Sequence, residues 1–150
     1  MNNLLWVGFP YYICITNNEY LGNGIQHILE DRDDVMYVSL HRFTKYFYPG
    51  TGSIEEVGHG TGRGSTVNIP WECTGLNDAD YLAAFDLIIE PIVKQFAPDI
   101  IIVSAGFDAV DGDPLGGMCV TPEGNQLQLP RIPVFYLKAC VNSNRIIVNQ

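Results

Sequence analysis

The chain has 150 residues and a formal net charge of −9, with 8 Lys and Arg against 17 Asp and Glu. A hydrophobic fraction of 47% and a charged fraction of 17% exclude a disordered chain and indicate one globular domain or a piece of a larger one. The acidic excess provides no electrostatic footprint for nucleic acid, so we expect no direct nucleic-acid binding and favour a basic polypeptide or a small molecule.

The first apolar stretch, LLWVGFPYYICI (4–15), lacks a basic leader and a small-residue cleavage site, and it is too short to span a membrane. We interpret it as a buried strand region, with a signal peptide as the alternative, and expect no membrane association. The four cysteines are widely spaced without a C-x-x-C pair, which favours neither a disulfide framework nor a zinc finger. We therefore expect a reducing location, cytoplasmic or nuclear.

Five short apolar runs are predicted to be strands: YYICI (11–15), VMYVSL (35–40), TVNI (66–69), DIIIVSA (99–105) and RIIV (145–148). Their β-branched residues and nearly continuous hydrophobicity are typical of strands that are covered on both faces, as in a parallel sheet. No internal repeat, low-complexity segment or linker divides the chain.

Two helices are predicted between these runs, over 22–34 and 78–98. In the second helix, Asn77 or Asp78 can cap the start and Pro91 should bend or weaken it. Its apolar residues share one face at helical spacing: Tyr81, Phe85, Ile88, Ile89, Ile92 and Phe96. Strands that alternate with helices indicate an α/β fold, in which ligands bind at the carboxyl ends of strands. Asp108 lies just beyond such an end.

The segment PGTGSIEEVGHGTGRG (49–64) is dense in glycine and suggests a phosphate-binding loop at first sight. Its glycines do not fit G-x-G-x-x-G in any register, and no Gly-Lys pair follows. We therefore predict a long loop without a phosphate site, and this weakens a nucleotide-binding function for the chain.

Several motifs in fixed order resemble the zinc-dependent histone deacetylases over residues 22–124: GNGIQ, MYVSLHRF, FYPGTG, EVGHGTGRG, VNIPW, DADYLAAF, FAPDIIIVSAGFDA and GDPLGGMCVTPEG. DADYLAAF and GDPLGG are most similar to the class IIb, tubulin-deacetylase-like branch. The resemblance implies the arginase/deacetylase fold, a parallel sheet flanked by helices. It also implies hydrolysis of acetyl-lysine amides, with acetylated histones or tubulin as substrates and corepressor complexes as partners.

The resemblance also implies a zinc ion held by two aspartates and one histidine, which acidifies a water and polarises the amide carbonyl. Asp108 matches one aspartate; a cap on the following turn is its alternative role. Asn18 stands at the position of the other aspartate and Tyr20 at that of the histidine. An amide and a neutral phenol are poor zinc ligands, and Glu19 should point to the opposite face of the strand. We therefore expect that zinc is not bound here.

Other family positions are matched only in part. The tandem histidines and the oxyanion tyrosine of the family are not found in this sequence. Ser39 and Leu40 match positions that help bind a structural potassium ion, which stays possible here. Tyr48 replaces a phenylalanine of the acetyl-lysine tunnel, and Leu115 matches its rim. The three histidines show no metal-binding spacing, so we expect them to be packed or solvated.

The predicted organisation is a divergent segment 1–21, a partial deacetylase domain 22–124 and a divergent segment 125–150. In the last segment NQLQLPRIPVFYLKAC has two prolines where the family has a helix. We expect a truncated or alternatively joined deacetylase that is catalytically inactive. The alternatives are a non-catalytic interaction module and an unstable fragment with low solubility, since unpaired strand edges favour aggregation.

Overall fold

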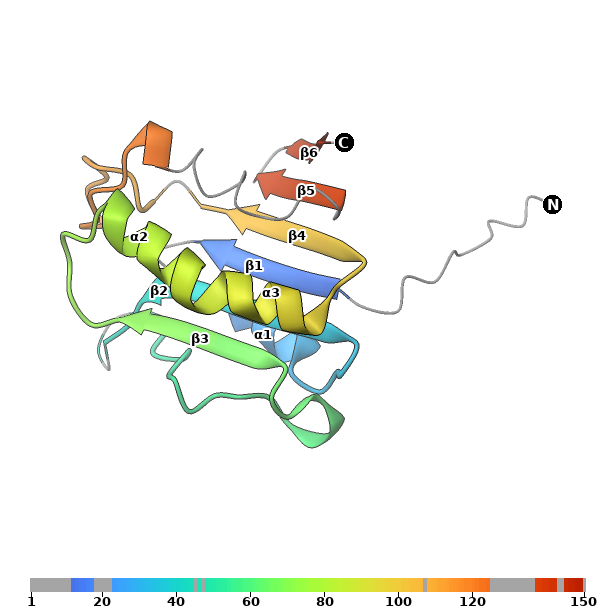
Figure 1. The fold of residues 1–150 in the computed structure, drawn as a ribbon. Helices are drawn as coiled ribbons and strands as arrows, with labels where there is room; N and C mark the ends of the chain where they lie inside the picture. The colour runs from blue at the N-terminus through green and yellow to red at the C-terminus, as the bar shows by residue number, and fades with distance from the viewer. Residues whose placement is uncertain are drawn as a thin grey trace.

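The computed structural model of the protein describes residues 12–17, 23–44, 46, 48–106, 108–124, 137–142 and 145–149. Its strands form one six-stranded sheet in the order β3-β2-β1-β4-β5-β6, with helices on both faces (Figure 1). The strands are β1 (Tyr12–Asn17), β2 (Val35–Arg42), β3 (Thr66–Trp71), β4 (Ile100–Ala105), β5 (Leu137–Asn142) and β6 (Arg145–Asn149). The predicted α/β class is confirmed.

Strands β1 to β5 pair in parallel, and β6 returns antiparallel to β5. All five predicted strands are present, as β1, β2, β3, β4 and β6. Strand β5 is not predictable from the sequence pattern, because LKACVN contains a single β-branched residue and follows a segment with two prolines.

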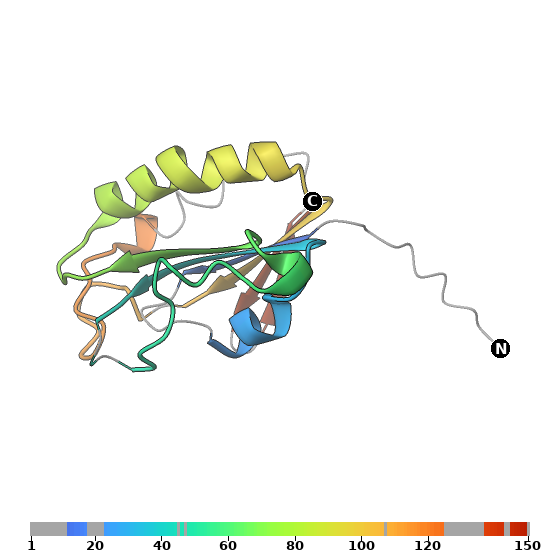
Figure 2. The ribbon, with the colours of Figure 1, turned by 90° about the horizontal axis from the view of Figure 1, so that it is seen from below.

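Figure 2 shows the helices on opposite sides of the sheet. The short helix α1 (Asn23–Leu29) lies on one face, joining β1 to β2. The other face is covered by one long helix that consists of α2 (Asp78–Ala84), the π-helical turn η2 (Phe85–Ile89) and α3 (Glu90–Phe96). Within the described residues, no helix is both long and apolar enough to cross a membrane.

The larger core lies between the sheet and the long helix. Side chains of β2 alternate between the faces: Val38 and Leu40 point to the long helix, whereas Tyr37 packs against α1. The buried members of the larger core include Ile15, Val38, Leu40, Ile101 and Val103 from strands and Tyr81, Phe85, Ile89 and Val93 from the helix. Because helices cover both faces of the sheet, the strands are hydrophobic along nearly their whole length.

Pro91 explains the π-helical turn. A proline inside a regular α-helix has no N–H for the carbonyl four residues earlier, here that of Leu87, and its ring clashes with that carbonyl. The wide turn Phe85–Ile89 immediately precedes Pro91, which takes a position in the first turn of α3. The helix therefore continues past Pro91 instead of ending there.

The wide turn also changes which residues are buried. Phe85, Ile89 and Val93 are buried at spacings of four residues, whereas Ile88 is 37% exposed. Our placement of Ile88 on the buried face is wrong, because it assumed a regular helix and the π turn rotates the residues that follow it. At the start of α2, Asn77 is the cap, and its side chain accepts a hydrogen bond from the Ala79 N–H at 2.9 Å.

Candidate functional site

The carboxyl ends of β1 and β4 meet at the centre of the sheet. These two strands are parallel neighbours, and Asn17 at the end of β1 is in register with Ala105 at the end of β4. From this point the strand order runs in opposite directions, which makes it the topological switch point where open α/β sheets bind ligands. Asp108 follows β4 by three residues and is half-buried. Asn18 and Tyr20 lie outside the described residues.

The described residues contain no group of three or more His, Cys, Asp or Glu side chains that could hold a metal ion. His27 and His59 are exposed and approach the same carboxylate, that of Glu30, at 3.3 Å and 3.6 Å. His41 is fully buried. Among the described residues, none of these three histidines therefore forms a metal-binding group with Asp108.

His41 connects β2 to the glycine-dense loop. Its Nε2 lies 2.9 Å from the carbonyl oxygen of Gly52, so Nε2 carries the proton and donates it. Its Nδ1 lies 2.8 Å from the Ser39 hydroxyl, which donates to the neutral ring. Burial lowers the pKa of His41, although the Gly52 carbonyl and the nearby Glu56 carboxylate act to raise it. The ring is thus held neutral and structural.

Glu56 holds the same loop from within. Its Oε1 accepts hydrogen bonds from the N–H groups of Gly52 (2.8 Å) and Ser53 (3.0 Å). Its Oε2 accepts one from the Gln26 amide of α1 at 2.6 Å. Burial acts to raise the pKa of Glu56, but hydrogen bonds from Ser53, Gln26 and Gly52 outweigh it and lower the pKa. An ionised Glu56 therefore fixes the loop against α1.

The two positions matched to a potassium site lie side by side in β2. Ser39 is fully buried, and its hydroxyl is bonded to His41. Leu40 is also fully buried and packs in the larger core on the opposite face. These are contacts of the two side chains, and they do not test potassium binding. Potassium binding through Ser39 and Leu40 therefore stays a prediction.

A second loop, residues 108–120, follows the carboxyl end of β4. Backbone hydrogen bonds from Asp111 N–H to Val120 O and from Val120 N–H to Ala109 O join its two ends. Within it, the Asp113 carboxylate accepts hydrogen bonds from the N–H groups of Leu115 (2.9 Å) and Gly116 (2.8 Å). These contacts fix the turn that carries Leu115, whose side chain is 67% exposed.

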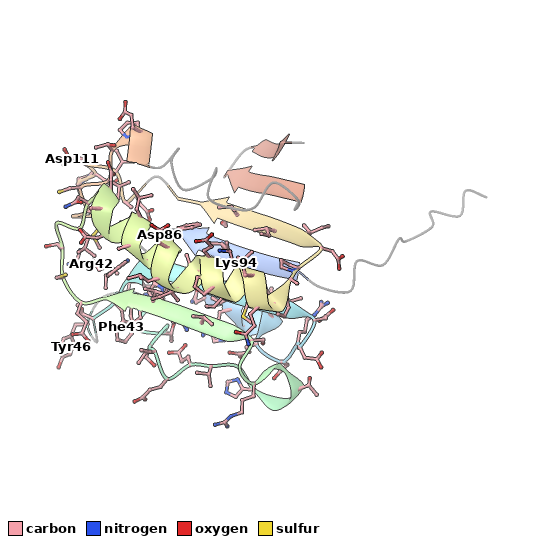
Figure 3. All side chains as sticks on the ribbon, in the orientation of Figure 1. Arg42, Phe43, Tyr46, Asp86, Lys94 and Asp111 are labelled. Atoms are coloured by element: carbon pink, nitrogen blue, oxygen red, sulfur yellow. The ribbon has the colours of Figure 1, made fainter. Side chains whose placement is uncertain are left out.

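Arg42 joins this loop to the end of β2, with its Nη1 3.4 Å from the carbonyl oxygen of Gly116. Figure 3 labels Arg42, Tyr46 and Asp111, and all three lie at the end of the sheet toward which the arrow of β4 points. Tyr48 belongs to the segment that follows Arg42 and is 72% exposed. Both predicted tunnel residues, Tyr48 and Leu115, are therefore exposed on loops; a shared tunnel stays a prediction.

Three residues that position these loops were not predicted from the sequence: Arg42, Glu56 and Asp113. Glu56 offered a signal, since a carboxylate inside a loop rich in glycine N–H groups is placed to accept hydrogen bonds from the backbone. Asp113 offered another, because Asp commonly accepts hydrogen bonds from N–H groups two or three residues later in a turn. The contact from Arg42 to Gly116 spans 74 positions and left no local signal.

Comparisons with known proteins give a consistent result. A family model described as the histone deacetylase domain matches residues 20–143, beyond both ends of the 22–124 span. Histone deacetylase 15 of Arabidopsis thaliana is 53% identical over 104 residues, which cover 69% of this chain and 19% of that protein. Histone deacetylase HDA1 of Candida albicans is 52% identical over 106 residues, covering 69% of this chain and 13% of that protein.

Two solved structures are similar along most of the chain. The crystal structure of the HDA15 HD domain matches with a TM-score of 0.85 and 40% identity, covering 92% of this chain and 40% of that one. The structure of the histone deacetylase Clr3 matches with a TM-score of 0.82 and 38% identity, covering 89% of this chain and 23% of that one. The chain thus spans a minor part of the proteins that it resembles.

Proposed function

Since this chain belongs to the histone deacetylase domain family, we propose that it is a non-hydrolytic member that binds protein partners without cleaving acetyl-lysine. The observation that carries this proposal is the set of residue types at the three positions that match the zinc ligands of the family. One carboxylate, Asp108, follows β4, while the sequence after β1 supplies Asn18 and Tyr20 at the other two ligand positions. The proposal depends on the chemistry of these three groups.

Zinc does not fit this set of donors. Family members bind zinc through two carboxylates and an imidazole, which supply two negative charges and a nitrogen ligand. Here a single carboxylate supplies one charge, and the Asn18 amide and the Tyr20 phenol are neutral oxygen donors. We therefore derive no hydrolytic step for this chain.

The proposed partners follow from the family. Acetylated histone or tubulin peptides, and complexes that contain other deacetylases, are the expected binding partners, in the nucleus or the cytoplasm. The exposed Tyr48 and Leu115 support this proposal, because large apolar side chains on fixed loops provide contact area for a peptide. A place close to the tubulin-deacetylase-like branch, and the division at residues 22 and 124, stay predictions.

Zinc binding tests the proposal directly. The purified chain is dialysed against zinc and then against buffer, and the bound metal is measured by plasma mass spectrometry. We expect no retained zinc in the unaltered chain. The double variant Asn18→Asp, Tyr20→His restores the family's donor types, and we expect it to retain close to one zinc per chain. Adding Asp108→Ala should abolish that binding, because one ligand is then lost.

Turnover of an acetyl-lysine peptide from a histone tail is measured in parallel. Zinc at close to one per chain in the unaltered protein, lost on Asp108→Ala, would contradict the proposal, as would turnover that depends on Asp108. A double variant that binds no zinc would show that the donor types at positions 18 and 20 are not the reason why zinc is not bound, and would contradict the proposal.

A further inference from the structure

Among the described strands, β3 forms one edge of the sheet, and no other described strand pairs with the outer side of its backbone. The N–H of Tyr37 donates to the Ser65 carbonyl and that of Phe43 to the Trp71 carbonyl, both at 2.8 Å. Residues 65 and 71 therefore direct their backbone groups toward β2. Because this direction alternates along a strand, Thr66, Asn68 and Pro70 direct theirs away from the sheet.

Pro70 fits this arrangement. Proline has no backbone N–H, and in a sheet it is tolerated where that N–H would face away from the neighbouring strand. The open edge of β3 thus presents two donors, the N–H groups of Thr66 and Asn68, and three acceptors, the carbonyls of Thr66, Asn68 and Pro70. This is the pattern to which an extended peptide can add as a further strand.

A groove of about 570 Å³ runs along this edge. Ile88 of the long helix lines it on one side of the sheet, and Ile54 and Val57 of the glycine-dense loop line it on the other. Ile54 is 72% exposed, and Ile88 and Val57 are each 37% exposed. The edge is therefore flanked by apolar side chains above and below, as a strand that adds to a sheet requires.

Two polar residues of β3 form the loop side of the groove. Thr66 and Asn68 are 2% and 6% exposed and line the groove. Among the described residues, neither the Thr66 Oγ1 nor the Asn68 Oδ1 has a hydrogen-bond partner. Both atoms are themselves buried, so they lie beneath the surface of the groove. The Asn68 Nδ2 donates to the Glu56 carbonyl at 3.2 Å, which holds the glycine-dense loop beside β3.

The charge of the groove indicates which kind of partner fits it. Glu72, just after β3, lines the groove and is exposed, and the whole chain has a net charge of −9. Two copies of β3 would repel each other by charge, and the missing N–H of Pro70 would remove hydrogen bonds from their pairing. These features disfavour a second copy and favour a basic strand.

We propose that the open edge of β3 binds an extended segment of a partner protein in which apolar residues alternate with Lys or Arg. Its apolar side chains pack against Val67, Ile69 and Ile88 on the helix side. Its basic side chains lie on the loop side, where their stems cover Ile54 and Val57 and their charged ends approach the carboxylate of Glu72.

The probe is a fluorescein-labelled peptide, Lys-Val-Lys-Val-Lys-Val-Lys, titrated with the full chain and followed by fluorescence anisotropy. Binding should weaken by about tenfold or more when the valines become serine, because the helix side loses apolar burial. It should also fail when every peptide amide is N-methylated, since the added strand can then donate no hydrogen bond. Hydrogen exchange of the Thr66 and Asn68 amides should slow when the unmodified peptide binds.

Protein variants locate the site. Ile54→Asp should weaken binding by about tenfold or more, because it places a charge in an apolar contact. Ile28→Asp is the matched control, since Ile28 is 75% exposed on α1 and does not line the groove. Glu72→Gln should reduce the salt dependence of binding, whereas Glu123→Gln should leave it unchanged.

Several outcomes would overturn the proposal. These are an absence of binding, binding that survives N-methylation, and equal binding by Ile54→Asp and Ile28→Asp. A concentration-dependent dimer that Ile54→Asp dissociates would assign the edge to a second copy instead. None of these measurements depends on zinc or on turnover, so their results are separate from those that test the proposed function.

Discussion

His41 and Glu56 bind the same residue, Gly52, from two directions. The Nε2 of His41 lies 2.9 Å from the Gly52 carbonyl oxygen, and the Oε1 of Glu56 accepts the Gly52 N–H at 2.8 Å. One partner comes from β2 and the other from the loop itself, which α1 holds through Gln26. The start of the glycine-dense loop is thus fixed by a buried neutral ring and an ionised carboxylate.

This arrangement predicts that acid destabilises the protein through His41. The pKa of His41 is lowered from 6.5 because burial disfavours the charged ring. Below pH 6.5 the unfolded chain therefore binds a proton that the folded chain does not, so the free energy of unfolding should decline as the pH falls toward the lowered pKa. Above pH 6.5 both states are neutral at this residue, and the contribution is constant.

Urea unfolding followed by circular dichroism at about pH 7.5 and about pH 5.5 measures this effect. His41→Gln should lose most of the decline between the two conditions. His59→Gln is the control, because the His59 side chain is 70% exposed. A decline in His41→Gln equal to that of the unaltered chain would assign the pH dependence to other groups.

The charge of Glu56 should stabilise the fold. Gln at this position has one acceptor oxygen, whereas Glu56 accepts hydrogen bonds from Gly52, Ser53 and Gln26. Glu56→Gln should therefore lower the free energy of unfolding by about 1–3 kcal/mol at neutral pH. Glu55→Gln, at the exposed neighbouring position, should change it by less than about 0.5 kcal/mol. Equal effects would refute the role of these contacts.

The lowered pKa of Glu56 predicts a second pH range in which the stability of the fold changes. Its unfolded value is 4.5, so the stabilisation from its charge is present above pH 4.5 and is lost as the pH falls through the lower folded value. Glu56→Gln should therefore show a smaller loss of stability below pH 4.5 than the unaltered chain. Unfolding midpoints in urea across this range test it, with Glu55→Gln again as the control.

The π turn predicts that alanine substitutions at two adjacent isoleucines differ in their cost to stability. Ile89 is fully buried, so Ile89→Ala should cost about 2–5 kcal/mol of unfolding free energy. Ile88 is 37% exposed, so Ile88→Ala should cost less than about 1 kcal/mol. A regular helix would place both on the apolar face that the sequence indicates. Equal losses, measured by urea unfolding, would argue against the wide turn.

The sequence predicted what is locally encoded. Continuous β-branched runs predicted β1, β2, β3, β4 and β6, because a strand covered on both faces needs them. Asp108 was placed correctly beyond a strand end for the same reason. The buried residues of the long helix could not be predicted from regular helical spacing, since Pro91 changes the turn before it. The hydrogen bonds from Gln26 to Glu56 and from Arg42 to Gly116 join segments far apart in sequence, and no local pattern reports them.

Two glycines should respond in opposite ways to an added methyl group. Gly62 packs against the turn after α1, where a Cβ would lie 2.5 Å from the Arg32 nitrogen and from the Glu30 carbonyl oxygen. Both are backbone atoms that cannot rotate away, so Gly62→Ala should destabilise the protein by about 1–3 kcal/mol. It should also displace the loop that contains His59, whose N–H donates to the Glu30 carbonyl at 2.7 Å.

Gly24 lies in α1 with nothing within 4 Å of a Cβ. Gly24→Ala should therefore stabilise the protein by about 0.5–1 kcal/mol, because alanine loses less backbone entropy than glycine in a helix. Thermal unfolding of the two variants beside the unaltered chain measures both shifts. If Gly62→Ala were neutral or stabilising, it would contradict the close approach of the loop to the turn after α1, because the added Cβ would then not overlap the backbone there.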